Sequence, residues 1–246
     1  MNPEFLWVTV GALAGGFVNG LTGFGTAMSA LVFWLQVLQP TTAASLAAIC
    51  SVIGQVQALP TVWHAINWKR VLPFLVGGVA GIPVGTYLLA LIDIATFKFW
   101  VGAFVTTYCA VMLVNRSRLV LDLGSFFDGA IGFIGGVLGA LAGLSGAVPT
   151  LWAGLRGWDK DERRAVFQAF NLTILSITVV AHAAAGLLTR SVGYALLLAV
   201  PGTVIGSFLG QRLYRSLDER RFDQLVLGIL LIAGILLMFA ARGARG

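Results

Sequence analysis

Long apolar runs alternate with short polar connections along the 246 residues of the chain. Six runs are close to the roughly 20 residues that a helix needs to cross a 30 Å hydrocarbon layer. None of the six carries Asp, Glu, Lys or Arg at its centre. We therefore predict six membrane-spanning helices, over residues 42–62, 71–91, 97–114, 165–188, 192–213 and 222–241.

Two further apolar runs, residues 5–38 and 127–155, are longer and are rich in glycine near their middle. The interruptions fall around residues 19–25 and at residues 143–149. Each glycine weakens a helix by roughly 0.5–1 kcal/mol. Non-helical backbone is tolerated at membrane depth only where protein or a water-filled cavity surrounds it. We therefore predict a broken helix in each run and a transport site where the two breaks lie.

The two interrupted runs are copies of one another. At a shift of 120 residues, Gly15 matches Gly135, Leu21 matches Leu141 and Gly23 matches Gly143. This internal duplication divides the chain into a first transmembrane repeat at residues 1–115, a cytoplasmic linker at 116–126 and a second repeat at 127–246.

The distribution of Lys and Arg decides how the two long runs are threaded, because these residues collect on the cytoplasmic side. If each long run crosses once, the 16 basic residues divide seven to nine between the two sides. If each folds back, they divide twelve to four. We therefore expect fold-back or an equivalent double crossing. The expected fold is an all-α polytopic membrane protein with two inverted repeats, each a broken or re-entrant glycine-rich helix plus three transmembrane helices. The twelve basic residues that fold-back places on one side of the membrane are Lys69, Arg70, Arg116, Arg118, Arg156, Lys160, Arg163, Arg164, Arg212, Arg215, Arg220 and Arg221.

Composition agrees with a polytopic membrane protein. Hydrophobic residues make up 58% of the chain, charged residues 11%, and mean hydropathy is +0.91. The net charge of +6 is spread over connections rather than gathered on one stripe, which argues against nucleic acid as a partner and leaves the lipid bilayer. Cys50 and Cys109 stand alone in apolar runs, so we expect neither a disulfide nor a metal site, and no cofactor. The start of the chain lacks the basic region of a cleaved signal peptide.

Neutral polar residues are the candidates for chemistry inside the membrane. Residues 42–62 carry Ser51 and Gln55 on one helix face, and residues 165–188 carry Gln168 and Asn171 on another. Together with the broken tips, these side chains and exposed N–H groups favour an anionic substrate. Hydrogen bonding between helices is the alternative role for each of them. The proposed substrate-binding set is Asn19, Thr22, Gly23, Gly25, Thr26, Ser51, Gln55, Gly143, Ser145, Gly146, Gln168, Asn171 and His182.

A catalytic interpretation competes with transport. Residues 143–146 read G-L-S-G, which resembles the G-x-S-G motif of rhomboid intramembrane proteases, and His182 would be the base for Ser145. The duplication argues against it, because Ser145 corresponds to Gly25 and the motif is then one copy of a repeated turn. We expect no enzymatic activity. His182 has three possible roles: a hydrogen bond between helices, a contact to substrate, or a titrating group that couples transport to protons. A scaffold for membrane assembly is a further alternative.

The duplicated glycine motifs resemble those of the TauE/SafE family of sulfite and sulfonate exporters. The first reads G-G-x-x-x-G-L-x-G-x-G from Gly15, and the second reads G-G-x-x-G-x-L-x-G-x-x-G from Gly135, followed by Pro149. In the first copy Ser29 stands in place of Pro149. The resemblance covers nearly the whole chain and implies a bacterial inner-membrane carrier that exports a small organosulfur anion such as sulfite, sulfoacetate or a related sulfonate. The alternative is a carrier that takes up another small anion or a neutral metabolite. Glycines 77, 81 and 85 would allow either a homodimer seam or packing within the bundle.

Overall fold

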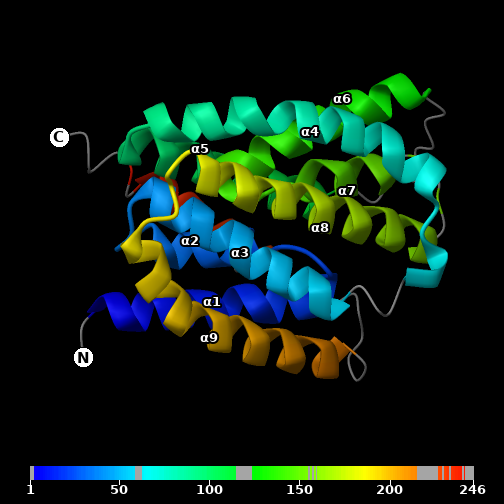
Figure 1. The fold of residues 1–246 in the computed structure, drawn as a ribbon. Helices are drawn as coiled ribbons and strands as arrows, with labels where there is room; N and C mark the ends of the chain where they lie inside the picture. Colours follow the sequence, from blue (N-terminus) through cyan, green and yellow to red (C-terminus); the bar gives the residue numbers. More distant parts are fainter. Residues whose placement is uncertain are drawn as a thin grey trace.

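The computed structural model describes residues 3–58, 63–114, 124–154, 156, 158, 160–214, 227–228, 230–232, 234–239 and 241. Over these residues the regular structure is helical throughout (Figure 1). The helices are α1 (Pro3–Thr22), α2 (Thr26–Trp34), α3 (Pro40–Ala58), α4 (Trp68–Leu91), α5 (Ile94–Val114), α6 (Ser125–Ala142), α7 (Ala147–Gly154), α8 (Lys160–Ala184) and α9 (Arg190–Tyr214), with a 3₁₀ turn at Trp63–Ala65 before α4.

Seven of these helices are long and apolar enough to cross a membrane. This confirms the all-α polytopic class. Five of the six predicted spans appear as α3, α4, α5, α8 and α9. The sixth, residues 222–241, lies partly outside the described residues; its Leu230–Phe239 part is a shorter apolar helix. Glycines meet where it crosses α5, because a Cβ on Gly102 would come 2.7 Å from the Gly234 carbonyl oxygen.

The first long run folds back as a hairpin. α1 ends at Thr22, the turn occupies residues 23–25, and α2 returns along α1 toward its start. The Trp34 indole N–H donates to the Val8 carbonyl oxygen at 3.0 Å, which fixes the far end of α2 against α1. Trp34 is fully buried, so it belongs to the core rather than to the membrane interface. The break is shorter than residues 19–25, since Asn19 lies within α1.

The second long run repeats this hairpin with α6 and α7. The turn covers residues 143–146, so Pro149 is the third residue of α7 and lies outside the break we had predicted at residues 143–149. Proline suits the first turn of a helix because its missing N–H would have no partner there. The Trp152 indole N–H donates to Asp128 Oδ1 at 2.7 Å and ties α7 to the first turn of α6. The fold-back threading of both long runs is therefore confirmed.

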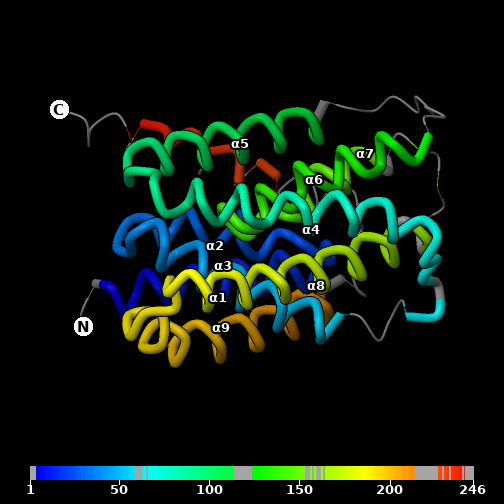
Figure 2. The backbone as a smooth tube through the Cα atoms, turned by 45° about the horizontal axis from the view of Figure 1, so that its top comes forward, coloured from blue at the N-terminus to red at the C-terminus, as the bar shows by residue number. Residues whose placement is uncertain are grey.

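Glycine-lined crossings join each hairpin to a helix from the other half of the chain. Gly81 and Gly85 of α4 lie on the backbone of α6 at Phe133 and Val137. In the same way α9 lies on α1 (Figure 2). In both pairs the contacts advance together along the two sequences, so the paired helices run parallel. The glycine face of α4 thus packs within the bundle, against α6.

The remaining contacts give each helix a direction. Near the start of α3, Ser45 contacts His182 at the end of α8. Near the end of α3, Gln55 contacts Gly23, which lies against Gln168 near the start of α8. α3 and α8 therefore run antiparallel. α1, α3 and α9 therefore run one way, and α4, α6 and α8 run the other way (Figure 1). Basic residues gather where α4 and α8 begin and α9 ends, which we term the charged end. Its described basic residues include Lys69, Arg70, Arg156, Arg164 and Arg212.

Replacing Gly136 by alanine tests the close α4–α6 crossing. A Cβ at this position would collide with the backbone of Gly78, so we expect a loss of about 1–3 kcal/mol of stability from overpacking. The measurement is thermal unfolding of the detergent-purified protein. Gly193→Ala in α9 is the matched control, because nothing lies within 4 Å of its Cβ position and alanine favours a helix. Equal melting temperatures for the two variants would contradict the crossing.

Candidate functional site

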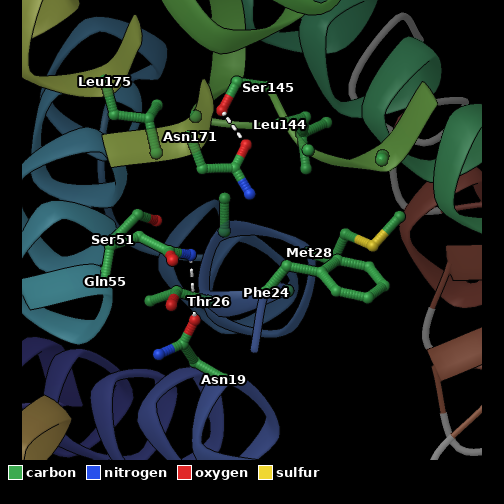
Figure 3. A pocket seen from close by; sticks show the side chains of 15 residues that line it. Asn19, Phe24, Thr26, Met28, Ser51, Gln55, Leu144, Ser145, Asn171 and Leu175 are labelled. Atoms are coloured by element: carbon green, nitrogen blue, oxygen red, sulfur yellow. Dashed lines mark hydrogen bonds between the residues drawn. The ribbon is translucent and has the colours of Figure 1, made fainter. Parts of the chain in front are cut away.

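A small polar cavity lies where the two hairpin turns meet in the interior of the bundle (Figure 3). Its volume is about 20 Å³, which is room for about one water molecule. None of the lining residues is ionisable. They come from α1, α2, α3, α8 and both turns: Asn19, Phe24, Gly25, Thr26, Ala27, Met28, Ser51, Gln55, Gly143, Leu144, Ser145, Gly146, Ala147, Asn171 and Leu175.

The first turn points the start of α2 into this cavity. Gly23 and Gly25 have φ of +80° and +96°, a backbone region that L side chains rarely adopt, which explains why glycine stands at both positions. Gly25 is the N-cap of α2 and no side chain caps the helix. The first N–H groups of a helix have no partner within it. The N–H groups that begin α2 at Thr26 therefore act as uncapped donors with a partial positive charge.

The second turn presents a weaker donor set. Gly143 has φ of +71°, and the chain then turns through Ser145 and Gly146 into α7. The Ala147 N–H is directed to the Leu144 carbonyl oxygen at 3.4 Å. Pro149 has no N–H to offer. The two tips are therefore unequal, and the first supplies most of the backbone donors.

Amide side chains complete the cavity wall. Gln55 donates from Nε2 to the Gly23 carbonyl oxygen at 2.9 Å and to Asn19 Oδ1 at 3.5 Å. The Ser145 hydroxyl donates to Asn171 Oδ1 at 2.8 Å (Figure 3). These bonds use the amide oxygens of both asparagines as acceptors, so each Nδ2 remains a donor; that of Asn171 points toward the cavity (Figure 3), and that of Asn19 lies against Gly54 of α3.

Three buried polar atoms of the lining have no hydrogen-bond partner among the described residues. They are Asn19 Nδ2, Thr26 Oγ1 and Gln55 Oε1. A buried polar group without a partner costs about 1–3 kcal/mol, so native proteins rarely keep three together. An amide donor and a hydroxyl beside an uncapped helix start are the groups that bind an oxyanion. The cavity is therefore suited to an anion that accepts hydrogen bonds from the donors among them.

Nine of the thirteen residues proposed from the sequence line this cavity: Asn19, Gly25, Thr26, Ser51, Gln55, Gly143, Ser145, Gly146 and Asn171. The other four do not. Thr22 donates its hydroxyl to backbone oxygens and shapes the first turn. Gly23 and Gln168 lie together on the side of that turn facing the charged end. His182 lies outside the lining, between α3 and α6.

His182 occupies an interhelical position. Its Nε2 lies 2.9 Å from the Ala140 carbonyl oxygen and donates to it, so Nδ1 accepts from the Ser45 hydroxyl at 3.0 Å. Both ring nitrogens are thus engaged, and Ser145 is bonded to Asn171 instead. The structure does not assemble the Ser145–His182 dyad of a protease.

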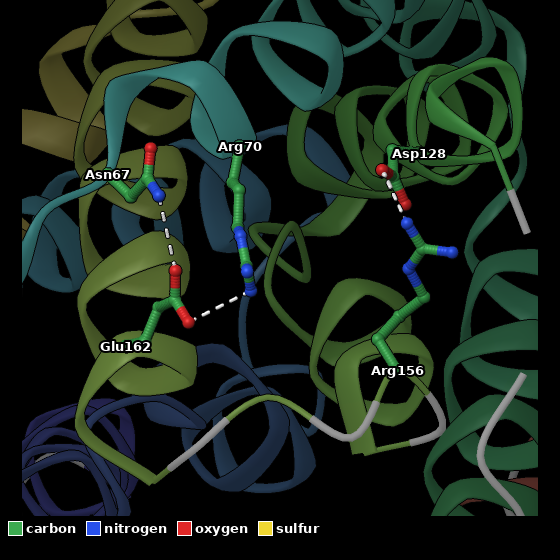
Figure 4. Close-up of polar contacts among 5 residues, drawn as sticks. All are labelled: Asn67, Arg70, Asp128, Arg156 and Glu162. Atoms are coloured by element: carbon green, nitrogen blue, oxygen red, sulfur yellow. Dashed lines mark hydrogen bonds and ion pairs between the residues drawn. The ribbon is translucent and has the colours of Figure 1, made fainter. Parts of the chain in front are cut away.

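An ion-pair cluster that the sequence did not predict holds the charged end together (Figure 4). Arg156 lies 3.5 Å from the buried carboxylate of Asp128, and Arg70 lies 2.9 Å from Glu162. The guanidinium groups of Arg70 and Arg156 lie 4.8 and 5.9 Å from the ring centre of Trp158. The charged loop after α7 is therefore bound to α4 and α6. Only the charge run at residues 156–164 signalled it.

An apolar groove lies beside the cavity. Its volume is about 510 Å³, and its walls come from α4, α5 and α6. Leu144 lines both spaces, so the second turn separates the polar cavity from this groove. Among the described residues no group of three or more His, Cys, Asp or Glu could hold a metal ion.

Paired broken helices around an uncharged polar cavity, among seven membrane-length helices in the described residues, are typical of a multi-pass membrane carrier. The chain belongs to the sulfite exporter TauE/SafE family, whose model matches residues 7–237. This confirms the resemblance of the glycine motifs and places the protein among inner-membrane transporters. Searches of curated proteins and of solved structures returned no match.

The engaged nitrogens of His182 lead to a test of the protease alternative. A serine-directed fluorophosphonate probe is expected to leave the purified protein unlabelled, because Ser145 has no base beside it. The measurement is in-gel fluorescence of the wild type beside Ser145→Ala. Labelling that disappears in the variant would show an activated serine and contradict the site described above.

Proposed function

We propose that this protein is a secondary carrier that moves a small organosulfur anion, such as sulfite, sulfoacetate or a related sulfonate, out of the cell. The observation that carries the proposal is the uncapped start of α2 beside the unpartnered donors Asn19 Nδ2 and Thr26 Oγ1. A sulfonate or sulfite group has several acceptor oxygens and no need of a carboxylate. The family match supports this substrate class.

The cavity chemistry favours an anion over a cation. Helix starts and amide N–H groups donate, and the unpartnered side-chain atoms of the described lining that can accept are Gln55 Oε1 and the Thr26 hydroxyl oxygen, neither of them charged. A metal cation would need several oxygen ligands and carboxylates, which this lining lacks. A neutral metabolite gains less from the partial positive charge of the α2 start. Uptake of another small anion is the second candidate, because the donor set does not itself fix direction.

Alternating access is the mechanism that fits the architecture. The cavity holds about one water molecule, so a polyatomic anion enters only when a hairpin turn moves. α1 and α3 of the first half run in one direction, and their counterparts α6 and α8 of the second half run in the opposite direction. This reversal supports the inverted-repeat arrangement that such carriers use. The Arg70–Glu162 and Asp128–Arg156 pairs would close the charged end while the other end opens.

Membrane potential supplies a driving force for export. With the inside negative, outward movement of an anion gains about 2.3 kcal/mol per charge per 100 mV. The described basic residues gather at the charged end, which the positive-inside rule assigns to the cytoplasm. An anion released at the other end therefore moves down the electrical gradient without a carboxylate relay.

Ligand-induced stabilisation tests the substrate class and the site together. A ligand that binds the folded state raises apparent stability by RT ln(1 + [L]/Kd), which is about 2.7 kcal/mol at 100 times Kd. We expect sulfite or a sulfonate, but not sodium or magnesium ions, to raise the melting temperature of the purified protein.

Two variants test whether the ligand that raises the melting temperature binds in the cavity. Asn171→Ala removes an amide of the cavity wall and is expected to abolish the shift. Gln36→Ala is the matched control, since its side chain donates to the Val32 carbonyl oxygen outside the cavity, and it should keep the shift. A shift caused only by carboxylates or cations would contradict the substrate class, and a shift unchanged in Asn171→Ala would contradict the site.

A further inference from the structure

One stripe of α8 connects the charged end to the cavity. Arg164, Gln168 and Asn171 stand at positions i, i+4 and i+7 and so share one face of the helix. Asn171 lines the cavity, whereas Arg164 begins the membrane-spanning part of α8. Side chains that can donate hydrogen bonds are therefore spaced about one helical turn apart along this route.

The first hairpin turn covers the middle of this stripe. A Cβ built on Gly23 would lie 3.0 Å from Gln168 Nε2 and 3.5 Å from Arg164 Nε. The turn thus rests directly on both side chains. Gly23 is glycine because its φ is positive and because the amide leaves little room.

Gln168 is the unexplained member of the stripe. Its side chain is 1% exposed, and neither Oε1 nor Nε2 has a hydrogen-bond partner among the described residues. A purely structural side chain in this place would be apolar, since a buried unpartnered amide costs free energy. If the Gly23 turn moves away from α8, the amide of Gln168 and the guanidinium of Arg164 face the same opening.

The second hairpin turn has no such partner. A Cβ built on Gly143 would lie 3.1 Å from the Cβ atoms of Ala27 and Ala47. At the shift of 120 residues that relates the halves, Arg164 and Gln168 correspond to Ala44 and Ala48. The route beside the first turn therefore carries charge and an amide, and the route beside the second carries alanines. This difference suits an anion that is loaded at the charged end and released at the other end.

We propose that Arg164 and Gln168 form a loading site for the transported oxyanion on the cytoplasmic side of the Gly23 turn. Arg164 attracts the anion and offers paired N–H donors, and Gln168 passes it to Asn171 when the turn opens. This inference rests on the proposed function and adds the cytoplasmic half of the pathway to it.

The test uses inside-out membrane vesicles, in which the cytoplasmic face is outward, with sulfite as the probe. Arg164→Gln is expected to raise the KM for sulfite uptake about tenfold at low salt, because removing a steering charge slows anion capture. High salt should shrink the difference, since screening weakens the same attraction in the wild type. Arg164→Lys keeps the charge and should recover most of the loss.

Arg212→Gln is the matched control. It removes the same charge from the same end of the bundle but from the last turn of α9, and it should leave KM unchanged. Equal effects of Arg164→Gln and Arg212→Gln would overturn the loading site and indicate only a general surface field.

Gln168→Leu separates a loading role from a structural one. Because the amide has no partner, leucine of similar size should leave the melting temperature unchanged or higher, while sulfite uptake falls at least tenfold. A lower melting temperature with unchanged uptake per folded protein would overturn the proposal. If wild-type vesicles take up no more sulfite than vesicles lacking the protein, the proposed function fails as well. If the wild type takes up sulfite and the Arg164 and Gln168 variants take it up equally well, only the loading site is overturned.

Discussion

The structure depends on one constraint: a backbone that leaves the helix inside a membrane must be enclosed by protein, because lipid offers its N–H and C=O groups no hydrogen-bond partners. Two turns break this chain at membrane depth, and each is surrounded by α3, α8 and the opposite hairpin. The enclosure requires helices to approach closely. The glycine crossings of α4 on α6 and of α9 on α1 provide that approach, and each joins one half of the chain to the other.

The same enclosure produces the chemistry. A helix that begins inside the protein brings uncapped N–H donors to a buried place with little room for water, and α2 does so after Gly25. Electrostatic attraction is stronger in such surroundings than in water. The polar side chains of the lining are amides and hydroxyls rather than charged groups, so the anion we propose would be held by dipoles, with no opposite charge to retain it. Weak, distributed binding of this kind suits a carrier, which must also release its cargo.

Much of this arrangement could be predicted from the sequence. Five of the predicted spans followed from run length and the fold-back of both long runs from the positions of Lys and Arg, and the duplicated glycines located both turns to within a few residues. Nine of the thirteen proposed site residues line the cavity, because spacing of three or four places Ser51 with Gln55 on one face. His182 could not be placed in this way. Its partners, Ser45 and Ala140, come from distant parts of the chain, and spacing within one helix does not reveal them. Trp34 and the Asp128–Arg156 pair were missed for the same reason.

The central claim is that the start of α2 and the facing amides of Asn19 and Asn171 hold an oxyanion. An experimental structure of the purified protein with selenite, the selenium analogue of sulfite, tests it most directly through the anomalous signal of selenium. We expect a peak between the two hairpin turns, with oxygens within hydrogen-bonding distance of the Thr26 N–H and of Asn171 Nδ2. A peak confined to the basic residues of the charged end, or an empty cavity at a selenite concentration that raises the melting temperature, would contradict it.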